Sequence, residues 1–428
     1  MTKKHSYLNI AAVLLSVLLV AMPFHAAIVT ILGNYLPFKT LLQAWKEILI
    51  FIVGVLCAFA VYKDRSLLKF DNTNRIAVVI IIFSLVVSLI RFNELYAFLA
   101  GVKTNLVVLV LFLEAQVLAS KYSFEKIFKI VLIPAVIVAV IAILQPVLFR
   151  PEILNMIGYG PESINAEQFV EYSNQSIRVF STLGGPNQLG AYLIIPFAMS
   201  LVWAIKSRKI IWYLLPLVFM LPIYMSYSRS AWIGGIVAAI VVVGLNFKPK
   251  IQLAVGLGVL VLLSTFGYIF YTGSVCDYLA GPVSILVHGD CSSGELGGSD
   301  MMRVDSIDNG IATIQANPFG TGIGTAGPAS FYTKSPLIVE NWYLQIAIEI
   351  GLIGLALYLV FIVLNMIKLY IRSKEKNYSV LPSMLFASIC GVLVASLFLH
   401  TLADSTLSIL LFGLLGLVIN HRFEEKTL

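Results

Sequence analysis

Charged side chains that could do chemistry are few in this sequence, and they stand in very apolar surroundings. Arg229 lies in a tight serine-rich link between two apolar runs, and Arg303 lies in the first turn of an amphipathic stretch. Glu340 directly precedes Asn341 and another long apolar run. A guanidinium group binds phosphate oxygens through paired hydrogen bonds, and a carboxylate can accept the proton of a hydroxyl. These residues predict a site that holds a phosphate-type anion beside a general base.

The stretch around Arg303 predicts a helix over residues 300–316, ended by Asn317-Pro318. Apolar residues recur on one helical face: Val304, Ile307, Ile311 and Ile314. In its first turn, free N–H groups and the helix dipole favour an anion near Arg303. The glycine-rich residues 319–324 follow, and we interpret them as a flexible turn of the site. The competing interpretation is a surface loop beside a solvated helix.

Four further residues are candidates for binding a diphosphate or another part of a substrate: Arg178, Lys103, Asn341 and Asn187. Lys103 is expected about two turns inside a membrane span, where a charge is costly and therefore suggests function. Asn187 follows a Gly-Gly-Pro turn and could instead cap the next helix. Arg229 could simply anchor a helix end among lipid headgroups. Glu340 could be a helix N-terminal residue favoured by the dipole.

The composition indicates a membrane protein. Of 428 residues, 59% are hydrophobic and 12% charged, and the mean hydropathy is +0.93. The apolar runs are long enough to cross about 30 Å of hydrocarbon and too uniform for barrel strands. We therefore expect one all-α, polytopic domain over residues 1–428, with about twelve spans: 8–32, 41–62, 76–91, 95–119, 127–149, 187–205, 210–226, 231–247, 251–271, 341–367, 380–402 and 405–420.

The charge distribution predicts the orientation of these spans. With a cytoplasmic N-terminus, most of the 29 Lys and Arg residues fall in the inner connections, as the positive-inside rule requires. Both termini are then cytoplasmic, and the long connections 150–186 and 272–340 lie outside. The net charge of +7 is accounted for in this way, so a nucleic-acid partner is not indicated.

Two of the four cysteines, Cys276 and Cys291, fall in the second outer connection. An oxidising compartment favours a disulfide between them. A zinc site is the alternative, but only His288 and Asp290 stand nearby, which is a poor ligand pattern. We expect no metal and no other cofactor.

Four segments resemble the O-antigen ligase and O-antigen polymerase superfamily over roughly residues 178–360. They are RVFSTLGGPNQLGAY from Arg178, SYSRS around Arg229, NPFGTGIG from Asn317, and NWYLQIAIEIGLIGL from Asn341. The resemblance implies a metal-independent glycosyltransferase with a GT-C-like membrane fold. It also implies a glycan donor on undecaprenyl diphosphate, presented at the outer face of a bacterial cytoplasmic membrane. The product would be a cell-envelope polysaccharide such as O-antigen, capsule or exopolysaccharide.

By this resemblance, Arg229 and Arg303 correspond to the two essential arginines that hold the diphosphate. The base of the family is usually a histidine before an asparagine, and here Glu340 stands in that place. His288 and His400 do not lie in the motif. The acceptor, either another lipid-linked glycan or the lipid A core of lipopolysaccharide, is left open. The alternative from another class is a multispan transporter or flippase of lipid-linked sugars.

Overall fold

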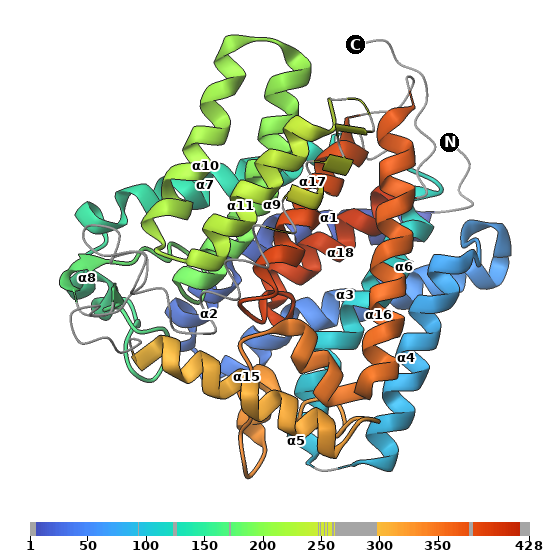
Figure 1. Cartoon of the computed structure of the whole chain (residues 1–428), viewed down its shortest axis with the longest axis horizontal. Coiled ribbons are helices and arrows are strands. Elements are labelled where there is room, and N and C mark those ends of the chain that lie inside the picture. Colours follow the sequence, from blue (N-terminus) through green and yellow to red (C-terminus); the bar gives the residue numbers. More distant parts are fainter. Residues whose placement is uncertain are drawn as a thin grey trace.

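The computed structural model describes residues 6–92, 94–122, 126–170, 173–246, 248, 250, 251, 253, 254, 256–258, 261, 298–375 and 380–419. Within them the chain is a bundle of helices with one small hairpin (Figure 1). The prediction of an all-α polytopic membrane protein is confirmed. The predicted disulfide between Cys276 and Cys291 lies outside the described residues and stays a prediction.

Among the residues that the structure describes, seven helices are long and apolar enough to cross a membrane: Tyr7–Gly33, Lys39–Lys63, Asn72–Ile90, Leu95–Ala119, Lys129–Leu148, Pro186–Ser207 and Trp342–Lys374. Four shorter apolar helices are Ile210–Met225, Arg229–Gly244, Leu381–Ala395 and Ser405–Ile419. Together they coincide with every expected span except the ninth, 251–271, which lies largely outside the described residues.

The first half of the chain runs from α1 to a small hairpin. Its elements in order are α1 (Ser6–Ala21), the 3-10 turn η2 (Met22–Phe24), α2 (His25–Gly33), α3 (Lys39–Lys63), η3 (Arg65–Leu67), α4 (Asn72–Ile90), α5 (Leu95–Gly101), the π-helical turn η4 (Val102–Leu106), α6 (Val107–Ala119) and α7 (Ile127–Leu148). The next connection holds α8 (Pro151–Met156) and the antiparallel hairpin of β1 (Phe169–Val170) and β2 (Ser173–Ile177).

The second half supplies the central helices and the site. Its elements are α9 (Pro186–Ser207), η5 (Ile210–Tyr213), α10 (Leu214–Met225), α11 (Arg229–Gly244), α15 (Gly298–Ala316), η6 (Gly327–Tyr332), α16 (Trp342–Lys374), α17 (Leu381–Ala395), η7 (Thr401–Ala403) and α18 (Ser405–Ile419). The helix expected over residues 300–316 corresponds to α15. It lies across the lower left and lower centre of Figure 1.

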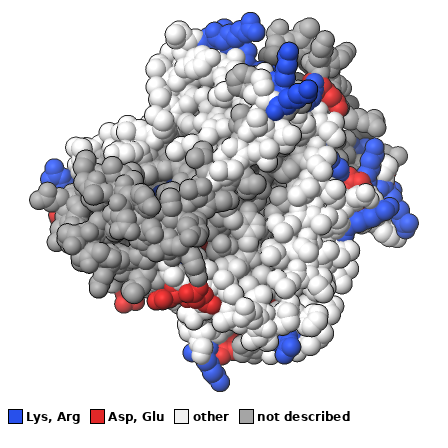
Figure 2. Space-filling model, in the orientation of Figure 1, with Lys and Arg blue, Asp and Glu red and all other residues white. Residues whose placement is uncertain are grey.

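The core sits around α18, which is buried from Thr406 to Ile419. This helix packs on α6 and α17, while α9 packs on α10, α11 and α17. On the face shown in Figure 2, most basic side chains lie toward the top and the right. Apolar side chains that face outward are numerous, as expected for a protein whose solvent is largely lipid.

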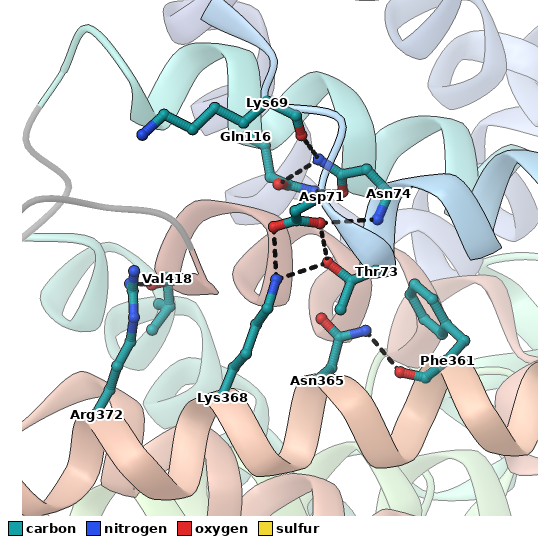
Figure 3. A network of polar contacts seen from close by, with 10 residues as sticks. All are labelled: Lys69, Asp71, Thr73, Asn74, Gln116, Phe361, Asn365, Lys368, Arg372 and Val418. Carbon is teal, nitrogen blue, oxygen red and sulfur yellow. Dashed lines mark hydrogen bonds and ion pairs between the residues drawn. The ribbon is translucent and has the colours of Figure 1, made fainter.

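A polar network fixes the end of the bundle opposite α15 (Figure 3). Lys368 on α16 donates to Asp71 at 2.6 Å and to Thr73 at 2.9 Å. Asp71 caps α4 by accepting from the backbone N–H of Asn74 at 3.1 Å. The Asn74 amide exchanges hydrogen bonds with Gln116 on α6, at 3.0 and 2.7 Å. The network therefore joins α4, α6 and α16 at one level.

Candidate functional site

The serine-rich link between α10 and α11 is a rigid turn, and it places Arg229. Ser226 donates to the carbonyl of Ile223 at 2.6 Å, and its hydroxyl accepts from the N–H of Ser228 at 3.2 Å. Tyr227 adopts a left-handed conformation with φ of 50°. Arg229 is therefore the first residue of α11, half-buried and held at the end of the bundle by the turn.

Arg178 leaves the end of β2 and is bound to the same turn. Its Nε donates to the carbonyl of Ser226 at 3.0 Å, and one terminal nitrogen donates to Asn187 Oδ1 at 2.8 Å. The structure contradicts a capping role for Asn187, because Gly185 occupies the N-cap of α9 and Asn187 accepts from Arg178 instead. Asn187 thus orients Arg178, and Arg178 lies against the turn that carries Arg229.

Arg303 and Glu340 form an ion pair between α15 and the residues before α16. Arg303 Nε lies 2.5 Å from Glu340 Oε2, with the two side chains 25% and 32% exposed. The N–H of Glu340 also donates to the Ser306 hydroxyl at 3.3 Å. Both contacts come from one face of α15, since residues 303 and 306 are neighbours on a helix surface. The amphipathic helix is therefore docked on the start of α16 through its polar residues.

The charges of these residues act on one another. Burial, followed by the charges of Arg303 and Arg229, lowers the pKa of Arg178 to about 10, while Glu340 opposes the shift. Three guanidinium groups and one carboxylate from four separate segments thus lie within electrostatic reach. At neutral pH the cluster carries more positive than negative charge, which is the condition for binding an anion.

Asn341 has a structural position. Its Oδ1 accepts from the N–H of Leu344 at 3.0 Å, so it is the N-cap of α16, and its Nδ2 donates to the carbonyl of Leu397 at 2.9 Å. Asn341, not Glu340, therefore caps this helix. Glu340 stands one residue before this cap, still at the N-terminal end of α16 where the dipole favours a carboxylate, and its carboxylate is paired with Arg303.

Lys103 belongs to a second polar cluster, which reaches from its own side chain, 40% exposed, to the buried Lys46. It pairs with Glu47 at 3.3 Å, and Glu47 also lies 3.4 Å from Lys46, a side chain only 1% exposed. Lys46 Nζ lies 2.9 Å from His25 Nε2, and Trp45 donates to His25 Nδ1 at 2.9 Å. No sequence pattern pointed to His25, because it stands on a different helix from its partners.

The glycine-rich residues after α15 are a structural support and not a flexible turn. Helix α16 is broken at Gly351, where φ is 75°. The carbonyls of Ile348 and Glu349, left without their usual helical partners, accept from the N–H groups of Thr321 at 2.8 Å and Gly322 at 2.9 Å. The turn therefore replaces the hydrogen bonds that the break in α16 removes.

Glu349 itself ties this support to the rest of the protein. Its fully buried carboxyl accepts from the N–H of Gly324 at 3.0 Å and from Asn105 on η4 at 2.5 Å. Glu349 is thus part of the scaffold behind the site.

His400 is a neighbour that sequence reasoning set aside. Its imidazole makes a hydrogen bond to the backbone of Val339, and the charge of Glu340 reaches it. Its Nδ1 is buried and has no hydrogen-bond partner among the described residues. No motif surrounds it, so only the fold could bring it beside Glu340. In the described part of the chain, no group of three or more His, Cys, Asp or Glu residues could hold a metal ion.

The fold and this cluster define a multi-pass helical membrane protein with a cation-rich polar site at one end of its bundle. Residues 214–359 match the family model described as O-antigen ligase. The match runs from α10 into α16 and includes Arg229, Arg303 and Glu340. No curated protein matches the chain. The resemblance to the O-antigen ligase and polymerase superfamily is confirmed for this region, and it supports a membrane glycosyltransferase of that type.

Proposed function

We propose that this protein transfers a glycan from undecaprenyl diphosphate to a hydroxyl of a second glycan or lipid, at the outer face of the cytoplasmic membrane. The observation that carries the proposal is the convergence of Arg178, Arg229 and Arg303 around Glu340. A departing diphosphate needs its developing charge stabilised, and preorganised guanidinium groups supply this without a metal. The excess of positive charge over Glu340 supports an anionic substrate group here.

The ion pair of Arg303 and Glu340 suggests how donor binding prepares the base. The diphosphate competes for the Arg303 guanidinium, and a shift of Arg303 toward the phosphates leaves the Glu340 carboxylate free. Glu340 then takes the proton of the acceptor hydroxyl, whose oxygen forms a bond to the anomeric carbon. The bond from that carbon to the phosphate oxygen breaks, and undecaprenyl diphosphate leaves with the electron pair. A single displacement of this kind inverts the anomeric centre.

The orientation follows from the same proposal. Both termini face the cytoplasm, as the distribution of Lys and Arg along the sequence favours. The cluster of arginines then faces the periplasm or the outside. Arg178 and Asn187 would orient the phosphates, and Asn341 would act by fixing the start of α16.

The test is an assay of purified protein with an undecaprenyl-diphosphate oligosaccharide, with and without a lipid A core acceptor, in buffer containing a metal chelator. Ladder formation without the acceptor means a polymerase, and transfer only to the core means a ligase. Both results support the proposal. Donor left unchanged under every condition, by protein that is folded and binds the donor, contradicts it.

One observation favours a transporter as the second candidate. The cluster of His25, Lys46, Glu47 and Lys103 lies among membrane-spanning helices, where charged side chains often line a substrate or ion path. A transporter would move labelled lipid-linked glycan across vesicles without consuming it. The same reconstituted vesicles therefore separate the two functions, because only the enzyme releases undecaprenyl diphosphate.

A further inference from the structure

A cavity of about 630 Å³ lies between α3 and α6, at the end of the bundle away from the arginine cluster. This volume is in the usual range for a bound small molecule or a lipid chain. Its walls are mainly apolar, and its residues include Gly54, Cys57, Ala58, Tyr62, Arg65 and Glu114. No step of the proposed glycosyl transfer uses it.

A buried carboxyl group, that of Glu114 on α6, also lines this cavity. Glu114 is only 4% exposed, and neither carboxyl oxygen has a hydrogen-bond partner among the described residues. Gly54 makes room for it, since a Cβ there would lie 2.6 Å from Glu114 Oε1. An ionised carboxylate buried without a cation is strongly unfavourable. The neutral acid is the stable form, and it carries one O–H donor that needs an acceptor.

The mouth of the cavity carries a positive charge. Arg65, in the short η3 turn after α3, is exposed and lines the cavity. Glu114 lies about 8 Å from the end of α6 at Ala119, at 1.5 Å per residue, so it is deeper in the bundle than the helix end. From the mouth inward, the cavity thus offers a guanidinium group, a buried O–H donor and an apolar wall.

We propose that this cavity binds a glycerophospholipid of the membrane leaflet on the Arg65 side. The phosphate pairs with Arg65, an ester carbonyl accepts from the Glu114 hydroxyl, and an acyl chain fills the apolar part. Two features favour this occupant. The charge of Arg65 complements the phosphate, and the unpartnered Glu114 hydroxyl needs an acceptor such as an ester carbonyl. An isoprenyl phosphate offers the chain and the phosphate but has no ester carbonyl for Glu114. The inference does not depend on the proposed transferase activity.

The binding test uses delipidated full-length protein, phosphatidylglycerol and undecaprenyl phosphate, with bound lipid counted by native mass spectrometry. Arg65→Gln should weaken phosphatidylglycerol binding about tenfold, because it removes a charge-assisted contact to phosphate. Glu114→Met removes the donor at similar volume and should weaken it as well, whereas Glu114→Gln keeps an N–H donor and should bind nearly as the parent does. Ala58 is an exposed lining residue, so Ala58→Trp should fill the cavity and abolish binding. Arg75→Gln, at an exposed arginine outside the cavity, is the matched control.

Chemical labelling gives an independent measurement. Dicyclohexylcarbodiimide reacts with protonated carboxyl groups in apolar surroundings, so it should modify Glu114 in delipidated protein, and phosphatidylglycerol should protect it. Equal phosphatidylglycerol binding by the parent, Arg65→Gln and Ala58→Trp would overturn the proposal. So would a Glu114 that is never labelled. Undecaprenyl phosphate bound as tightly as phosphatidylglycerol would overturn the choice of a glycerophospholipid.

Discussion

Glu340 is paired with Arg303, so a base role requires that this ion pair open. The change that tests it is Glu340→Gln, which keeps the shape but cannot accept a proton. We expect the transfer rate to fall by at least about 100-fold, the usual contribution of general base catalysis, while donor binding is retained. Glu340→His should keep measurable activity, because imidazole is a base near working pH. Turnover and donor affinity are measured separately.

The outcome that contradicts this role is Glu340→Gln protein elongating its substrate at the parental rate. His400→Gln and Asp305→Asn would then be the next variants to assay. His400 lies beside Val339, and Asp305 lies near Arg303 on α15. If donor binding were lost together with turnover, Glu340 would instead be required to position Arg303.

A second prediction at the scale of single residues concerns the arginines. Arg178→Lys keeps a cation but cannot reach both the Ser226 carbonyl and Asn187 with one planar group. We expect Arg178→Lys and Arg229→Lys each to lower the transfer rate by more than about tenfold, with normal expression. Arg150→Lys, an exposed arginine of the same connection as Arg178, is the control. Parental turnover in Arg229→Lys would identify Arg229 as a helix-end anchor only.

Among the elements, the broken helix α16 and the glycine-rich turn depend on each other. Gly324 has a φ of +85°, and a Cβ there would lie 1.9 Å from the carbonyl oxygen of Ala97. Gly324→Ala should therefore destabilise the protein by roughly 1–3 kcal/mol, measured as thermal unfolding in detergent. Gly235→Ala on α11 is the matched control, because a Cβ there meets nothing within 4 Å. It should be neutral or stabilising by up to about 1 kcal/mol. Equal loss in both variants would contradict the supporting role of the turn.

Hydropathy alone located most of these elements, because a run that must cross hydrocarbon leaves a long uniform signal. The sequence also indicated Arg229, Arg303 and Glu340, since charges are rare in such a chain. It could not show that Glu340 pairs with Arg303 while Asn341 caps α16. The two residues are adjacent in the chain, and only the directions of their side chains decide which partner each one has. The break at Gly351 was hidden as well. A glycine is compatible with an apolar helix, and the residues that repair the break come from about 30 positions earlier in the chain.

At the scale of the whole molecule, the two ends of α16 have different roles. The start, at Asn341, carries the candidate site, and the last turns are fixed by Lys368 through Asp71 (Figure 3). Arg372 on the same helix donates to the carbonyl of Val418 at 3.0 Å, which also fastens the end of α18. Loosening this end should therefore lower the stability of the bundle without touching the arginine cluster.

The pH dependence of unfolding tests whether the Lys368 end of α16 stabilises the bundle separately from the site. Burial alone would raise the pKa of Asp71, but hydrogen bonds from Lys368, Thr73 and the Asn74 N–H offset burial and hold the pKa below its usual value. The native protein then binds fewer protons at Asp71 than the unfolded chain does. Its contribution is present above the unfolded pKa of about 3.9 and is lost as pH falls through the lower native pKa.

We expect Asp71→Asn to cost about 1 kcal/mol at neutral pH, since the pair with Lys368 is partly exposed and screened. The unfolding temperature of the parent should fall more steeply than that of Asp71→Asn as pH is lowered from about 5 toward 3. Glu152→Gln, an exposed carboxylate on α8, is the control and should keep the parental slope. Transfer at neutral pH by folded Asp71→Asn should stay near the parental rate. If the unfolding temperatures of the parent and of Asp71→Asn fall with pH at the same slope, Asp71 does not stabilise this end. If folded Asp71→Asn loses turnover, the two ends of α16 are coupled.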